Sequence, residues 1–352
     1  MSTPKPALLR PDNFTPASRT PWGGTRLARQ YKRRWVDGLA EHLPIGESWE
    51  LSTGPEFPSV VEQPAGQISL EAYIASDLRA TLGHELALGR TSTALLVKLI
   101  DADQPLSLQI HPTDAYAGLS DGECGKPESW YVVAHEPGAG LYLGFQPGVN
   151  EQDVRKALAD GQALRALLRF VEVRPGDFFL IDAGTPHAIG AGLTLVEPQH
   201  VLPGKRGITY RYWDWDRRYD AHGNAYEQGE PRALHVEDAL RVTDWDRFSE
   251  PDFLDQVRLR GPAPDLTQSA QCRILSGDGG LPSPWLLVAR LSGNGTLTLP
   301  FDQRLTCLTV LQGEAQLGSL VVGAGRSAVI PACASQGDVE LRTASAIASA
   351  IA

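Results

Sequence analysis

The chain has 352 residues, which is enough for two compact domains, and contains no low-complexity tract. Its formal net charge of −10 argues against nucleic acid or an anionic membrane as the main partner, because both require a basic surface, but a small anionic substrate stays open. No segment has the apolar length of a signal peptide or a transmembrane helix, so we expect a cytoplasmic protein.

The first predicted strand covers residues 46–52. Side chains two positions apart share a face of a strand, so Glu47 and Trp49 should lie on one face. Ser48 and Glu50 should then lie on the opposite face. This strand is preceded by an irregular lead-in and a glycine-containing turn.

A helix is predicted over about 69–82, with Ser69 as a candidate N-cap residue. The apolar run at 93–100 predicts the next strand. Segment 106–112 follows directly and reads Leu-Ser-Leu-Gln-Ile-His-Pro.

Segment 106–112 alternates strictly between apolar and polar residues, which is typical of a half-buried strand. Ser107, Gln109 and His111 should therefore share one face. That face suits a metal or a polar ligand, but the simpler interpretation is a face that meets solvent. The heptapeptide alone does not decide between the two.

The clearest helical pattern covers 150–170, where Asn150 and Asp153 form a capping-box-like start. Further strands are predicted at 128–133, 171–173, 177–181, 194–197 and 208–213. The chain up to residue 226 is thus predicted to be a mostly β domain, with helices on its outside.

Residues 227–232 resemble a linker because they contain glycine and proline, and a short helix is expected at 235–242. From about residue 271 onward, short strands alternate with glycines, for example at 308–313 and 326–331. We therefore predict two domains, an N-terminal one over 1–226 and a smaller β domain, with its linker, over 227–352.

The four cysteines are widely scattered and form no C-x-x-C pair. They predict neither a thiolate zinc site nor a disulfide framework. Any metal in this protein must therefore be held by nitrogen and oxygen.

The most informative stretch is 175–187, in which a Gly-Asp turn, four apolar residues and Gly-Thr-Pro lead to His187. It resembles the second motif of the cupin superfamily of β-barrels, in which the final histidine is usually a metal ligand. The segment containing Gln109 and His111 resembles the first motif, with an insertion before the acid. Segment 322–332 weakly resembles half of a cupin motif. The implied fold class is mostly β, with two cupin-type (double-stranded β-helix) barrels and additional helices.

Several motifs together resemble a narrower family, the type I phosphomannose isomerases (mannose-6-phosphate isomerases), and specifically their short bacterial class. The matching segments are 21–27, 46–50, 106–114, 125–131, 184–190 and 210–214. They occur in the family's order between residues 20 and about 217, which is far more specific than any single motif.

The resemblance implies one metal ion, held by Gln109, His111, Glu128 and His187. Two imidazoles, a carboxylate and an amide oxygen suit Zn²⁺, although Fe²⁺, Mn²⁺ or Co²⁺ would fit the same ligands.

The implied reaction of carbohydrate metabolism interconverts mannose 6-phosphate and fructose 6-phosphate through a cis-enediol. Such a site needs a base, a means of stabilising the oxyanion, and cations for the phosphate. Arg211, Glu197 and Lys126 match active-site positions of the family. Ser107 and Lys98 match positions associated with the phosphate end. The identity of the base is left open.

Segment 198–207, which we interpret as a loop, departs from the family pattern because it is more basic and richer in proline. Lys205 and Arg206 in this segment could form an additional anion contact or alter which sugar is accepted. Two alternative functions remain open at this point: a non-haem metal oxygenase of the cupin type, and a non-catalytic cupin that binds a sugar phosphate. The sequence leaves the oligomeric state open.

Overall fold

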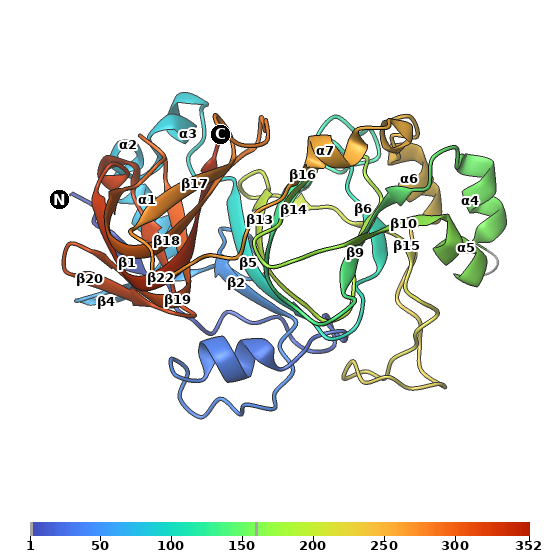
Figure 1. Cartoon of the computed structure of the whole chain (residues 1–352), viewed down its shortest axis with the longest axis horizontal. Helices are drawn as coiled ribbons and strands as arrows, with labels where there is room; N and C mark the ends of the chain where they lie inside the picture. Colours follow the sequence, from blue (N-terminus) through green and yellow to red (C-terminus); the bar gives the residue numbers. More distant parts are fainter. Residues whose placement is uncertain (1–2, 159–160) are drawn as a thin grey trace.

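The computed structural model describes residues 3–158 and 161–352. The described chain is mostly β, with short helices, and forms two β units that lie side by side (Figure 1). This confirms the predicted mostly β class with additional helices. No helix in these described ranges is long and apolar enough to cross a membrane.

Two antiparallel sheets face each other in the first unit, with residues 95–213 forming most of their strands. The smaller sheet has the order β10-β9-β12-β6-β15 and consists of β6 (Leu108–Ile110), β9 (Gly140–Phe145), β10 (Leu168–Glu172), β12 (His187–Ile189) and β15 (Tyr210–Trp213). The larger has the order β16-β11-β8-β13-β5-β2 and consists of β2 (Glu47–Leu51), β5 (Leu95–Ala102), β8 (Glu128–His135), β11 (Phe178–Ile181), β13 (Leu193–His200) and β16 (Arg258–Leu259).

A seven-stranded sheet forms the second unit. Its main path is β1-β21-β19-β22-β18-β17, and β20 pairs with β19. The strands are β1 (Ala7–Leu8), β17 (Gln271–Ser276), β18 (Leu286–Thr298), β19 (Thr306–Leu317), β20 (Leu320–Gly323), β21 (Ser327–Ile330) and β22 (Asp338–Ile351). Its strands are longer than the sequence pattern predicted, because β18, β19 and β22 each continue through glycines or polar residues.

Two small ribbons complete the β structure. They are the antiparallel pair β3 (Val60–Gln63) with β4 (Gly66–Ser69), and the parallel pair β7 (Glu123–Cys124) with β14 (Arg206–Gly207).

The helix predicted over 69–82 is two helices, α1 (Leu70–Ala75) and α2 (Leu78–Leu82). Ser69 caps α1 as predicted, by accepting a hydrogen bond from the Ala72 amide at 3.0 Å. The chain breaks at residues 76–77 because Asp77 caps a new helix, accepting a hydrogen bond from the Ala80 amide at 3.0 Å.

The helix predicted over 150–170 also differs in the structure. The capping box of Asn150 and Asp153 is present and begins α4 (Glu151–Ala157), and α5 (Gly161–Leu167) follows. Residues 159–160 of the predicted helix lie outside the described residues. Residues 168–170 belong to β10, because pairing with β9 replaces the helical conformation.

The remaining helical segments are short. They are the π-helix η1 (Leu27–Lys32), α3 (His84–Ala87), α6 (Val236–Val242), the 3₁₀-helix η2 (Arg247–Ser249), α7 (Phe253–Val257) and the 3₁₀-helix η3 (Ala332–Ala334). The helix expected at 235–242 is α6, which packs against β15 and β6. The sequence pattern did not predict the helical turn of η1.

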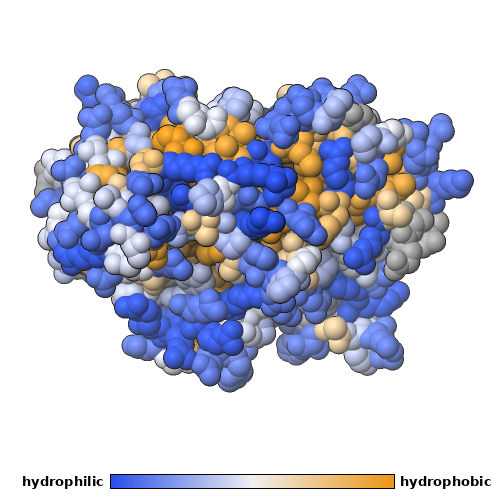
Figure 2. Space-filling view, in the orientation of Figure 1, coloured by the Kyte–Doolittle hydropathy of each residue, from blue (hydrophilic) through white to orange (hydrophobic). Residues whose placement is uncertain are grey.

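Apolar side chains form one core inside the first unit, one between the two units and one within the second. The middle core joins the outer face of the larger sheet, through residues such as Val97 and Leu99, to Ile347 of β22. Figure 2 shows that hydrophilic residues cover most of one face of the molecule, with apolar residues grouped in its upper half.

Strand pairing crosses the predicted domain boundary in both directions. Strand β16 pairs with β11 of the first unit, and β1 pairs with β21 of the second. The division into 1–226 and 227–352 stays a prediction.

Candidate active site

Strand β6 places the polar face of segment 106–112 toward the larger sheet. Leu108 and Ile110 point into the core and are fully buried. In register, Gln109 lies opposite His187 on one side and Arg211 on the other, so the three side chains share a face. The face is not solvated, because Ser107 and His111 are also buried.

Glycine turns present the second histidine. Gly176 and Gly184 adopt positive φ values of 97° and 84°, a conformation that costs glycine little. They bracket β11, and the chain after Gly184 returns through Thr185 and Pro186 to place His187 at the start of β12. The predicted Gly-strand-Gly arrangement therefore delivers the imidazole.

His111, Glu128 and His187 converge in the interior of the first unit. The Nε2 atom of His111 lies 3.2 Å from Glu128 Oε2, and the Nε2 atom of His187 lies 3.4 Å from Glu128 Oε1. The candidate ligand atoms of the three side chains all lie within 4.8 Å of one another.

Backbone carbonyls fix both imidazoles. His111 Nδ1 donates to the Ile208 carbonyl at 2.9 Å, and His187 Nδ1 donates to the Thr185 carbonyl at 2.8 Å. Each Nε2 atom is then left with a lone pair that points at the neighbouring carboxylate. Orientation of a ligating histidine through its other nitrogen is typical of metal sites.

Three buried atoms of this group have no hydrogen-bond partner among the described residues: His111 Nε2, His187 Nε2 and Glu128 Oε1. Buried polar atoms are rarely left unsatisfied, because each costs free energy. A divalent metal ion would satisfy all three at once, and an N,N,O donor set suits zinc. The residues present therefore fit the predicted metal.

Burial and neighbouring charges set the protonation of these ligands. Burial and the positive charge of Lys126 lower the pKa of His111 to about 3, and burial also lowers the pKa of His187. Burial alone would raise the pKa of Glu128, but His111 and Lys126 hold it below its usual range. Neutral imidazoles and an ionised carboxylate are the forms that bind metals.

Strand β13 supplies the next layer of the site. Gln199 lies opposite Glu128 and donates from Nε2 to Glu128 Oε2 at 2.6 Å. Two residues earlier on the same face, Glu197 accepts a hydrogen bond from Trp130 Nε1 at 3.0 Å. Burial and the charge of Glu128 raise the pKa of Glu197 to about 8.

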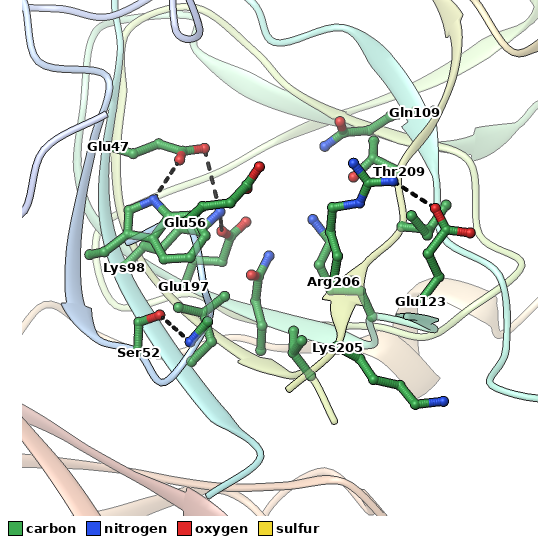
Figure 3. Close-up of a pocket in the computed structure, with 18 of the residues that line it drawn as sticks. Glu47, Ser52, Glu56, Lys98, Gln109, Glu123, Glu197, Lys205, Arg206 and Thr209 are labelled. Atoms are coloured by element: carbon green, nitrogen blue, oxygen red, sulfur yellow. Dashed lines mark hydrogen bonds and ion pairs between the residues drawn. The ribbon is translucent and has the colours of Figure 1, made fainter. Parts of the chain in front are cut away.

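Two lysines lie between these carboxylates. The Nζ atom of Lys98 is 3.4 Å from both Glu47 Oε1 and Glu197 Oε2, and lies 4.7 Å from the centre of the Trp49 ring. The Nζ atom of Lys126 is 3.8 Å from Glu128 Oε2. Figure 3 shows Glu47, Lys98 and Glu197 on one side of the cavity.

Arg211 reaches the cavity from the opposite side. Its Nε donates to Ser107 Oγ at 3.2 Å, and its Nη1 donates to the Ala233 carbonyl at 3.2 Å. Burial and the nearby charge of Arg232 lower the pKa of Arg211 to about 10. Arg232 is itself held by Asp214 through hydrogen bonds of 2.8 and 2.6 Å.

A cavity of about 550 Å³ connects these groups. Of the predicted site residues, Lys98, Ser107, Gln109, Lys126, Glu197 and Arg211 line it. The three remaining ones, His111, Glu128 and His187, are buried, and Glu128 contacts Lys126 and Gln199, which line the cavity. The volume is in the range of small-molecule sites.

Sequence reasoning missed Gln199, Glu47 and Trp130 as site residues. Gln199 was missed because segment 198–207 was interpreted as a loop, whereas residues 198–200 continue β13. The parity of the strand could have found it, since Gln199 lies two positions after Glu197. Glu47 carried the same kind of signal through its shared face with Trp49.

Comparisons with known proteins agree with this site. The family model for the catalytic domain of type I phosphomannose isomerase matches residues 16–141. The chain is 32% identical over 294 residues to the mannose-6-phosphate isomerase of Streptococcus mutans, covering 80% of this chain and 84% of the relative. It is 30% identical over 292 residues to mannose-6-phosphate isomerase ManA of Bacillus subtilis, covering 78% of this chain and 83% of the relative.

Solved structures share the whole fold. The mannose 6-phosphate isomerase of Bacillus subtilis superposes with a TM-score of 0.74 at 23% identity, covering 98% of this chain and 99% of that chain. A zinc-bound holo mannose 6-phosphate isomerase gives a TM-score of 0.64 at 16% identity over 99% of both chains. These similarities confirm the predicted cupin-type fold. The chain belongs to the type I mannose-6-phosphate isomerase family, as the sequence motifs predicted.

Proposed function

We propose that this chain is a metal-dependent aldose–ketose isomerase that interconverts mannose 6-phosphate and fructose 6-phosphate through a cis-enediol. The observation that carries the proposal is the group His111, Glu128 and His187, whose unpartnered atoms converge beside a cavity lined with cations and Glu197. The family membership names the reaction, and the geometry supplies the groups that it needs.

We propose that zinc is held by His111, Glu128 and His187, with Gln109 as the fourth ligand because it lies two positions before His111 and opposite His187. When bound, zinc would act as a Lewis acid on the sugar oxygens. The role of Gln199 is to orient the Glu128 carboxylate by its 2.6 Å hydrogen bond.

Glu197 is our candidate for moving the proton between C1 and C2. Its raised pKa, about 8, allows the carboxyl group to hold and release a proton near neutral pH. Trp130 fixes one of its oxygens, and the other faces Lys98. We assign Arg211 and Lys126 to stabilising the negative charge that develops on the enediol oxygens.

We place the phosphate end of the substrate near Ser107 and Lys98. Because the Oγ atom of Ser107 accepts a hydrogen bond from Arg211, its hydroxyl hydrogen is free to donate to an anion. A small phosphosugar, rather than nucleic acid or a membrane, fits the acidic net charge combined with a cationic cavity. A cytoplasmic location is part of the same proposal.

The test is a coupled assay of fructose 6-phosphate formation, run with metal analysis on the same sample. We expect turnover with about one zinc per chain, loss of turnover after chelation, and recovery when zinc is restored. Turnover that survives complete metal removal would contradict metal dependence. Oxygen consumption with bound iron would favour the oxygenase, and tight phosphosugar binding without turnover would favour the non-catalytic binder.

A further inference from the structure

The cavity is cationic although the chain is acidic. Seven lysines and arginines line it against five acidic residues, whereas the whole chain has 32 basic and 42 acidic residues. An excess of positive charge gathered in one place indicates an anionic ligand, and it raises the question of which cations are free to bind one.

Three of the cavity's cations are already paired with carboxylates. Lys98 is shared between Glu47 and Glu197, and Lys126 faces Glu128. Arg232 makes two hydrogen bonds with the buried Asp214. Each of these pairs is largely removed from water, so these cations can add positive charge near a phosphate, but exchanging their carboxylates for it would leave a buried carboxylate uncompensated.

Arg19 differs, because its partner is exposed. Its Nη2 lies 2.7 Å from Glu56 Oε2, and the two side chains are 46% and 40% exposed. An exposed ion pair of this kind contributes little stability. A phosphate dianion presents more charge and three acceptor oxygens, so it competes well with a single carboxylate for a guanidinium.

Aromatic side chains hold Arg19 in position. Its guanidinium lies 5.2 Å from the centre of the Phe57 ring, and Phe57 packs on Trp49 at 5.0 Å. Trp49 in turn lies against Lys98. Arg19 therefore lines the cavity on the side of Trp49 and Lys98.

We propose, building on the function proposed above, that Arg19 binds the phosphate group of the substrate and selects phosphorylated over unphosphorylated sugar. Glu56 holds the Arg19 guanidinium while the site is empty, and the phosphate takes the place of the Glu56 carboxylate. Both residues are charged in either state, so the exchange needs no proton transfer.

The first test is Arg19→Gln, assayed with mannose 6-phosphate. We expect KM to rise about 10- to 100-fold, the range for loss of one hydrogen bond between charged groups, with kcat changed less than about threefold. Turnover of unphosphorylated mannose, measured in parallel, should be the same in both proteins. Arg19→Lys should recover part of the loss. An unchanged KM in Arg19→Gln would overturn the proposal.

Glu56→Gln should change KM in the opposite direction to Arg19→Gln. A purely structural role of the ion pair would not produce this result. Freeing Arg19 should lower KM and tighten the binding of inorganic phosphate several-fold. Weaker phosphate binding in Glu56→Gln would overturn the exchange of partners. Thermal unfolding of each variant identifies any that fail to fold.

Two further arginines sharpen the result. Arg33→Gln is the matched control, because Arg33 forms an exposed ion pair with Glu41 outside the cavity, and it should leave KM unchanged. Arg206 lines the cavity and pairs with Glu123 at 2.6 Å, as Figure 3 shows. A large rise in KM in Arg206→Gln together with none in Arg19→Gln would overturn the assignment.

Calorimetric titration with inorganic phosphate separates this inference from the proposed reaction. Phosphate binding that weakens in Arg19→Gln supports the inference even if wild-type protein turns over no mannose 6-phosphate. Equal phosphate affinity in wild type and Arg19→Gln overturns it even if the isomerase is fully active.

Discussion

Strand β2 separates two polar clusters that differ in whether their buried atoms all have hydrogen-bond partners. On one face, Glu47 and Trp49 point to the cavity and contact Lys98. On the other face, Ser48 and Glu50 point toward the second unit. Both clusters contain a lysine and a carboxylate away from water, so burial of charge alone does not distinguish a functional site.

The cluster facing the second unit is fully satisfied. Lys32 Nζ donates to Glu50 Oε1 at 2.5 Å and to the Gly325 carbonyl at 3.0 Å. Glu50 also accepts hydrogen bonds from Ser48 and, across the units, from Ser327. The cavity side also holds the group of His111, Glu128 and His187, which instead has three atoms without a partner among the described residues. Single unsatisfied atoms also occur elsewhere in the described residues, for example Tyr131 Oη and Ser345 Oγ, so it is the convergence of three such atoms that marks the ligand site.

The largest effect should come from His111→Ala. We expect the variant to lose its metal and at least ~1000-fold in kcat/KM, because a metal Lewis acid contributes several kcal/mol to such a step. Metal analysis and the coupled assay on the same sample measure both losses. His135→Ala, at an exposed histidine, is the control, and a metal-loaded but inactive His111→Ala would contradict the assignment of His111 as a ligand.

Disrupting the cluster of Lys32 and Glu50 should lower the stability of the protein without changing its catalysis. Lys32→Met leaves Glu50 charged and unpaired, so we expect the free energy of unfolding to fall by about 3–5 kcal/mol. Adding Glu50→Leu should recover most of this loss, and kcat per folded molecule should stay unchanged in both. Urea unfolding measures the effect; a double variant as unstable as the single one would mean that packing, not charge, is responsible.

The smallest effect should come from Gln199→Ala, which removes one hydrogen bond to a proposed metal ligand. We expect metal affinity to fall about 10- to 100-fold, as is typical when the group that orients a ligand is lost. Competition with a chromogenic chelator measures the affinity. Gln152→Ala, on the exposed side of α4, should change nothing, and an unaltered affinity in Gln199→Ala would show that Glu128 needs no support.

Local patterns predicted much of this site. Strand parity grouped Glu47 with Trp49 and Ser107 with Gln109 on faces that line the cavity, because alternation depends only on neighbouring residues, although it did not identify Glu47 as a site residue. The cap at Ser69 was predictable for the same reason. The family resemblance then named the residues that converge with Gln109 and His111.

What depends on distant pairing could not be predicted. Residues 168–170 have helical spacing, but the edge of β9 recruits them as strand β10. Pro198 suggested a loop, yet it pairs in register with Val97 in the middle of a sheet. The contact of Lys32 with Glu50 and Gly325 joins residues with no shared local pattern, so nothing in the sequence pointed to it.

The pairing of β1 with β21 joins two segments that are synthesised far apart in time. Ala7 and Leu8 leave the ribosome about 320 residues before their partners Val329 and Ala328. At ordinary translation rates the interval is roughly 15 to 60 seconds. During that time Leu9, which is almost completely buried in the finished protein, can pair with Val61 but lacks the Ser327 carbonyl to which its amide donates. Strand β1 is thus synthesised well before the strand with which it pairs, and the length of chain between the two strands sets the interval.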